Sequence, residues 1–85
     1  MIIPAPLSTT ANLYEVRRNS FLKVIVISGD YGIRRYFNQL GIHSGDRLRV
    51  LRRAPFGGPL VVDNCGVQVA ISKQLAQKVH VELLP

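Results

Sequence analysis

The 85-residue sequence contains one cysteine, Cys65, and no tryptophan. A lone cysteine cannot form an internal disulfide, and the paired CxxC spacing of a small zinc domain is absent. Apolar runs such as Val24–Ile27 and Leu60–Val62 are far shorter than the roughly 20 residues that cross a bilayer. We therefore expect neither a disulfide-stapled domain nor direct membrane insertion, and the sequence favours a cytoplasmic protein.

Acidic residues are also few, five in all, and none is paired at a helical spacing that suits acid–base catalysis. No GxxxxGK[ST] loop is present to cradle a nucleotide phosphate, since Gly57-Gly58 is followed by Pro59. His43, Ser44 and Asp46 crowd one turn, which is poor geometry for a base, a nucleophile and an orienting group that must converge. The sequence predicts that the protein is not an enzyme.

Positive charge is abundant by contrast, because eleven Lys and Arg residues give a formal net charge of +6. Nine of these cations and only two acids lie between Arg17 and Arg53, whereas the charges from Ala54 to Pro85 sum to zero. A basic half of this kind indicates an acidic partner, which can be nucleic acid, a membrane surface or an acidic protein. The alternative is that the charge serves only the solubility of a small domain.

Hydrophobic residues make up 47% of the chain, and many are Val or Ile, which favour strands. Glycine- and proline-containing turns separate short apolar segments, as in a small β-rich domain. Apolar residues on both faces of the first segment predict a central, well-covered strand. We predict five short strands, at residues 21–27, 47–53, 60–63, 67–71 and 79–83.

One segment has the spacing of an amphipathic helix. Asp30 is placed to cap its first turn, and Gly41 to end it in a left-handed conformation. Ser72 is placed to cap a single helical turn that reaches Lys78. The apolar stripe of the longer helix consists of Ile33, Tyr36, Phe37 and Leu40.

Residues 1–12 are predicted to form a flexible N-terminal arm, and residues 13–85 a single domain. Strands this short usually curl into a barrel, which leaves few exposed edges. The predicted fold class is therefore all-β, a small barrel with one helix after the first core strand and a helical turn before the last strand.

The loop between the second and third predicted strands is the candidate site for partner binding. Prolines restrict its backbone, glycines let it turn sharply, and an aromatic side chain beside arginines is typical of a binding hot spot. The alternative is that the aromatic ring folds back and plugs an open end of the barrel. The predicted docking residues are Arg52, Arg53, Pro55, Phe56, Gly57, Gly58 and Pro59.

Two residue pairs are weak candidates for metal binding. His80 and Glu82 share one face of the last predicted strand, and His43 and Asp46 share a turn. Each pair supplies only two of the four ligands that a closed zinc site needs. We expect no required cofactor, although a pair of this kind can take an adventitious zinc or iron ion shared with a second protomer.

A set of motifs follows one another along the chain. The arginine-bearing segment Gly29–Ile42 is followed by Ser44-Gly45-Asp46. Arg52-Arg53, the loop 54–59, the strand 67–71 and the closing segment Ala76–Val81 come next. This ordered set resembles the FeoA family of small proteins of bacterial ferrous iron transport. The resemblance implies an SH3-like barrel that regulates a FeoB-type membrane permease. This permease, which carries a cytoplasmic GTPase domain, is the expected partner at the inner membrane face.

Two other functions stay open from the residues alone: a basic barrel that binds nucleic acid, and a metal-sensing domain. A similar domain ends some iron-dependent transcriptional repressors, but this sequence contains no helix-turn-helix before the predicted barrel. Few aromatics are free to stack on bases, so we expect nucleic acid to be the less favoured partner. The oligomeric state, including a homo-oligomer, is also left open.

Overall fold

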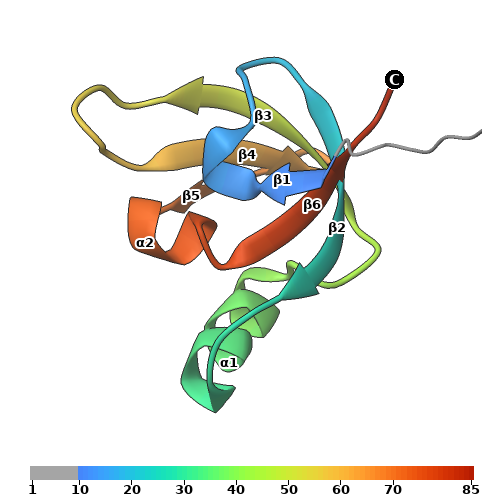
Figure 1. Cartoon of the computed structure of the whole chain (residues 1–85), viewed down its shortest axis with the longest axis vertical. Helices are drawn as coiled ribbons and strands as arrows, with labels where there is room; N and C mark the ends of the chain where they lie inside the picture. Colours follow the sequence, from blue (N-terminus) through green and yellow to red (C-terminus); the bar gives the residue numbers. More distant parts are fainter. Residues whose placement is uncertain (1–9) are drawn as a thin grey trace, which may run out of the picture.

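The computed structural model describes residues 10–85, which form a curled antiparallel sheet and three short helical segments (Figure 1). The six strands lie in the order β1-β6-β2-β3-β4-β5, so the ladder formed by residues 10–85 does not close on itself. The predicted all-β, SH3-like class is confirmed. The strands are β1 (Thr10–Asn12), β2 (Phe21–Ile27), β3 (Arg47–Arg53), β4 (Leu60–Asn64), β5 (Val67–Ile71) and β6 (Val79–Leu83).

Side chains alternate between the two faces of each strand, and those on the inner face form the core. Leu22 and Val24 of β2 face inward, and Leu48 and Val50 of β3 do the same. All five predicted strands are present, because each one places its β-branched and aliphatic side chains on the inner face of the curled sheet. The other core side chains are Leu13, Val16, Phe37, Ile42, Leu60, Val62, Val69, Ile71, Ala76, Val79 and Val81.

The sixth strand, β1, shows that the prediction of a flexible arm over residues 1–12 is wrong for residues 10–12. Thr10–Asn12 pairs antiparallel with β6, so these three residues belong to the sheet. Asn12 then caps a 3-10 helix, η1 (Leu13–Glu15), whose Leu13 is fully buried. Three residues are too few to show an alternating pattern, so the sequence did not predict this strand. It forms because β6, which is distant in the chain, offers an edge for pairing. The rest of the predicted arm, residues 1–9, lies outside the described residues.

The helix α1 (Tyr31–Leu40) has the predicted ends: the Asp30 carboxylate accepts from the Ile33 amide at 3.0 Å, and Gly41 has a φ of 80°. Phe37 is the fully buried member of the predicted stripe. The other three members are partly buried, because α1 covers one end of the barrel and does not lie across it (Figure 1). The short α2 (Lys73–Ala76) is capped by Ser72, as predicted. Within residues 10–85 no helix is long and apolar enough to span a membrane.

Strand β2 is central in the sheet, but the prediction that both of its faces are covered is wrong. Phe21, Ile25 and Val26 are 55%, 44% and 49% exposed. The pairing with β6 shifts register between Val24 and Val26, so the strand carries a bulge there. A central strand has hydrogen-bonded neighbours on both edges, yet no second layer covers the outer face of this single sheet.

Candidate docking site

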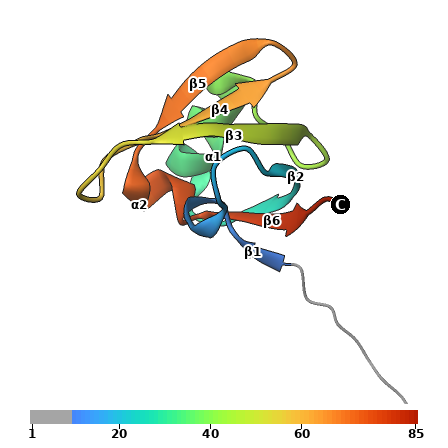
Figure 2. The same ribbon diagram turned by 90° about the horizontal axis from the view of Figure 1, so that it is seen from above.

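The loop between β3 and β4 is a tight, internally bonded hairpin that projects from one end of the sheet (Figure 2). The Ala54 amide donates to the Pro59 carbonyl at 2.9 Å, and the Gly58 amide donates to the Pro55 carbonyl at 3.2 Å. A Cβ at Gly58 would lie 2.7 Å from the Ala54 Cβ, so the turn requires glycine there. The loop is therefore held in one shape by its own backbone.

Phe56 is the side chain that this hairpin presents. Its relative exposure is 103%, and its φ of 59° is rare for a bulky residue. A plug in the barrel would be buried, so the alternative that Phe56 closes the barrel is excluded. Its neighbours Pro55, Gly57 and Pro59 are exposed too, so no adjacent large side chain shields the ring.

Arg52 and Arg53, at the base of the hairpin, differ in their exposure and contacts. Arg52 is exposed on the outer face of β3. The Arg53 guanidinium instead donates to the Tyr14 carbonyl and, at 2.6 Å, to the Val16 carbonyl, and it stacks 4.7 Å from the centre of the Tyr14 ring. Arg53 thus ties β3 to η1, and Arg52 is the arginine that is free to face a partner.

The two candidate metal pairs do not come together in the structure, and the ring of each histidine contacts another polar side chain. His80 Nε2 lies 2.7 Å from the Ser28 hydroxyl, and Glu82 lies in register between Thr10 and Lys23. No group of three or more His, Cys, Asp and Glu side chains comes together in residues 10–85.

The second pair, His43 and Asp46, closes the turn after α1. The Asp46 carboxylate accepts from the His43 amide at 2.8 Å and lies 3.7 Å from His43 Nδ1. His43 Nε2 lies 2.8 Å from the Asn38 Oδ1. Both ring nitrogens of His43 therefore have neighbours within the fold.

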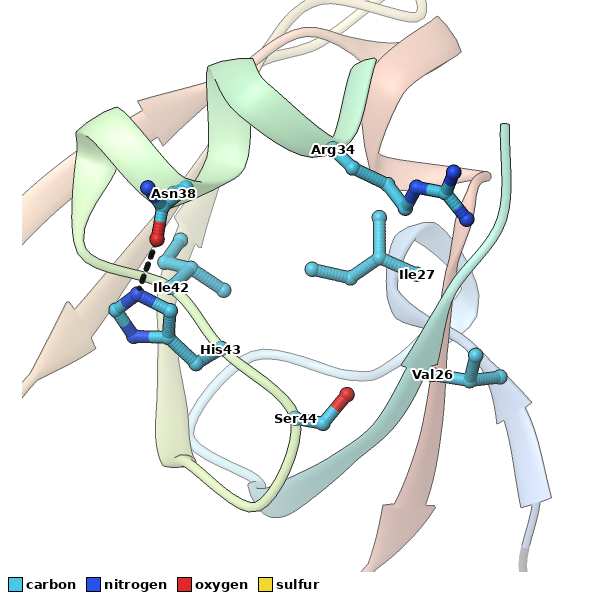
Figure 3. Close-up of a pocket in the computed structure, with 7 residues that line it drawn as sticks. All are labelled: Val26, Ile27, Arg34, Asn38, Ile42, His43 and Ser44. Carbon is cyan, nitrogen blue, oxygen red and sulfur yellow. Dashed lines mark hydrogen bonds between the residues drawn. The ribbon is translucent and has the colours of Figure 1, made fainter. Parts of the chain in front are cut away.

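His43 also borders a groove that the sequence did not reveal. The groove lies between the end of β2 and α1 and encloses about 270 Å³ (Figure 3). This volume is below the roughly 300–1,000 Å³ of typical small-molecule sites, and it suits a single apolar side chain. Three separate segments line it, so no local motif could have predicted it. Its lining residues are Val26, Ile27, Arg34, Asn38, Ile42, His43 and Ser44.

The architecture defines a small SH3-like domain with one exposed, proline- and glycine-rich hairpin. The chain belongs to the FeoA family, because the model of the FeoA domain matches residues 11–83. None of the curated proteins compared with this chain matches it.

Solved structures agree with this assignment. An iron uptake regulatory protein (FeoA) is 31% identical, with a TM-score of 0.83, and the match covers 88% of this chain and 99% of that one. A FeoA-like protein from Clostridium acetobutylicum is 29% identical over 93% of this chain and 92% of its own, with a TM-score of 0.82. A manganese-dependent transcriptional repressor is 32% identical over 93% of this chain but only 44% of its own length, with a TM-score of 0.83. The same fold therefore occurs alone and as part of a longer metal-dependent regulator.

Proposed function

We propose that this FeoA-family protein is a non-enzymatic cytoplasmic accessory of bacterial ferrous iron transport that docks on a FeoB-type permease. The family match supports a role in the Feo system. The observation that carries the docking mode is the fully exposed Phe56 on a hairpin held by its own hydrogen bonds. A rigid aromatic anchor binds with little loss of conformational entropy.

The charge around this anchor favours an acidic partner surface. The stretch from Arg47 to Val62 contains four arginines and no carboxylate. Lys73 also approaches the loop, since its Nζ would lie 3.7 Å from a Cβ at Gly57. We propose that Phe56 enters a pocket of the permease's cytoplasmic domain while Arg52 meets carboxylates at its rim, which steers association.

Co-purification with the FeoB-type permease of the same cell tests this proposal. The wild-type chain and two variants, Phe56→Ala and Tyr31→Ala, are compared with and without nuclease. Tyr31 is a matched control, because it is an exposed aromatic (71%) on α1 and not on the hairpin. We expect Phe56→Ala to weaken binding by about 2 kcal/mol or more, roughly thirtyfold, and Tyr31→Ala to change it little.

Three results would count against the proposal. Recovery of the permease that disappears with nuclease would indicate a nucleic-acid bridge. Equal loss with both variants would show that the hairpin is not the docking element. GTP turnover that co-elutes with the purified, monodisperse protein would contradict the non-enzymatic part.

The proposed function uses no resident metal. The metal-sensing alternative predicts tight binding of iron or manganese. In the structure the two histidine rings instead contact Ser28, Asn38 and Asp46. Calorimetric titration with each ion, on the wild type and on His80→Ala, separates the two. A specific submicromolar site that His80→Ala abolishes would favour metal sensing.

A further inference from the structure

The outer face of strands β2 and β3 is a second exposed surface, distinct from the hairpin tip. Phe21 and Lys23 alternate with buried Leu22 and Val24, so their side chains point outward. On β3, Arg47 and Arg49 point outward for the same reason and lie opposite Lys23 and Phe21 in register. We call this surface the basic outer face; its residues are Arg17, Arg18, Phe21, Lys23, Ile25, Val26, Arg47 and Arg49.

Backbone hydrogen bonds fix the turn that adds two of these cations. The Asn19 amide donates to the Val50 carbonyl at 2.6 Å, and the Val50 amide donates to the Ser20 carbonyl at 3.1 Å. Arg17 and Arg18, both exposed, are thereby held beside β3. The turn that carries these two arginines therefore lies next to β3, where the Arg49 guanidinium donates to the Asn19 side chain at 3.5 Å.

These cations are not neutralised by ion pairs. Glu82 lies opposite Lys23, and Asp63 lies opposite Arg49. Within residues 10–85, however, the single carboxylate–cation contact within 4.0 Å is His43–Asp46, which is elsewhere. Five Lys and Arg residues against two acids leave this face with a strong positive potential.

The same face exposes apolar side chains. The ring of Phe21 is half-exposed beneath the Arg49 guanidinium, whose carbon lies 5.4 Å from the ring centre. Ile25 and Val26 follow on β2, at the bulge, and are nearly as exposed as Phe21. A row of apolar side chains beside a row of cations is the arrangement with which a surface binds the headgroup region of a bilayer.

We propose that the basic outer face binds an anionic lipid surface directly, with Arg47, Arg49 and their neighbours on the headgroups and Phe21 at the interface. This goes beyond the expectation of no direct membrane insertion, because the contact is interfacial and crosses nothing. It does not depend on the hairpin, so the face can bind lipid whether or not Phe56 binds a permease.

Nucleic acid is the competing polyanion, and the residues on this face favour lipid. Single-stranded nucleic acid binds in grooves where several aromatics stack on successive bases. Here one aromatic, already stacked by Arg49, is accompanied by the aliphatic Ile25 and Val26. Aliphatic side chains bury well at a lipid interface and give a base no partner for stacking.

Vesicle binding tests the charged part of the proposal. Vesicles of phosphatidylcholine alone are compared with vesicles of phosphatidylcholine and phosphatidylglycerol in equal amounts, by co-sedimentation. The double variant Arg47→Ser/Arg49→Ser is set against Arg34→Ser/Arg35→Ser, which removes the same charge from exposed positions of α1. At about 1 kcal/mol per cation near the membrane, we expect the first pair to weaken binding to anionic vesicles roughly thirtyfold. We expect the second pair to change it less than about threefold, and raised salt to weaken wild-type binding.

The apolar part is tested with tryptophan, which the chain otherwise lacks. Phe21→Trp and Phe56→Trp each place one fluorophore, on the basic outer face and on the hairpin tip. We expect the emission of Trp at position 21 to shift to shorter wavelength with anionic vesicles and that at position 56 to stay unchanged. Thermal melts of both variants verify that they fold.

Several results would overturn the proposal. One is that the wild type does not bind anionic vesicles. Another is that the two pairs of arginine substitutions weaken vesicle binding equally. A third is that the tryptophan emission shifts in Phe56→Trp and not in Phe21→Trp. Tighter binding of a single-stranded oligonucleotide than of vesicles, lost in Arg47→Ser/Arg49→Ser, would assign the face to nucleic acid. Failure to bind the permease would leave the vesicle results unchanged, so the two proposals fail separately.

Discussion

Phe37 and Phe56 have similar neighbours in the sequence and opposite places in the structure. Each follows two consecutive arginines by a few residues, yet Phe37 is 0% exposed and Phe56 is 103% exposed. Phe37 belongs to a helix whose spacing brings it under the barrel, where its ring meets that of Tyr36 edge-on at 5.4 Å. Phe56 belongs to a turn whose backbone directs it into solvent.

The comparison shows that an aromatic residue contributes to stability or to recognition according to the backbone that carries it. On α1, periodic spacing concentrates apolar side chains on one face, and burial follows. In the hairpin, the turn fixes Phe56 at a positive φ, which costs about 1–2 kcal/mol for a residue with a Cβ. The stability of the domain should therefore depend on Phe37 and hardly at all on Phe56.

The largest effect is expected from Phe37→Ala. Removing a fully buried ring leaves a cavity, and such changes cost about 3–5 kcal/mol, which is comparable to the whole stability of many small domains. Urea unfolding followed by circular dichroism measures the loss. An unfolding midpoint equal to that of Phe56→Ala would contradict the assignment of the two rings.

Arg53→Gln should have the next largest effect. The variant loses the charge-assisted bonds to the Tyr14 and Val16 carbonyls, so a loss of about 1.5–3 kcal/mol is expected. Arg52→Gln is the control at the neighbouring, exposed position and should stay within about 0.5 kcal/mol of the wild type. If both variants unfold at the same urea concentration, Arg53 does not tie β3 to η1.

Leu40→Asp tests how much of the α1 stripe contributes to the core. Leu40 is only partly buried, and the new carboxylate meets the negative end of the helix dipole, so we expect a loss of about 1–2 kcal/mol. Arg35→Ala, on the opposite side of α1, should change stability by less than about 0.5 kcal/mol. Thermal melts compare the two, and complete unfolding by Leu40→Asp would show that α1 covers more of the core than Phe37 alone indicates.

The smallest effect on stability is expected from Phe56→Ala, within about 0.5 kcal/mol of the wild type. The ring packs on nothing within the domain, so its removal takes no contact from the core. Differential scanning calorimetry measures the melting temperature of the same sample used for partner binding. A fall as large as that of Phe37→Ala would mean that Phe56 packs against the domain in solution.

Much of the fold could be predicted because the decisive signals are local. The cap of Asp30, the left-handed Gly41 and the five strand segments each depend on neighbours within a few residues. The candidate hairpin was also local, since prolines and glycines flank its aromatic. The family could be inferred from the order of such local motifs.

What the sequence missed has long-range causes. Strand β1 exists only because β6, some 70 residues away in the chain, offers an edge for pairing. The groove that His43 borders joins β2, α1 and the turn between α1 and β3, and the place of Arg53 depends on carbonyls of η1. A pattern in one segment cannot specify which distant segment will meet it.

The sequence by itself determined five of the six strands, the helix with its ends, the excess of positive charge and a hairpin rich in proline and glycine, because propensity and periodicity act over neighbouring residues. Only the tertiary structure decided that Phe56 points into solvent, that Arg53 is bound internally while Arg52 is exposed, and that the outer face of β2 is uncovered. Exposure depends on which surfaces the curled sheet brings together, and a single sheet buries one face while leaving the other to solvent or to a partner.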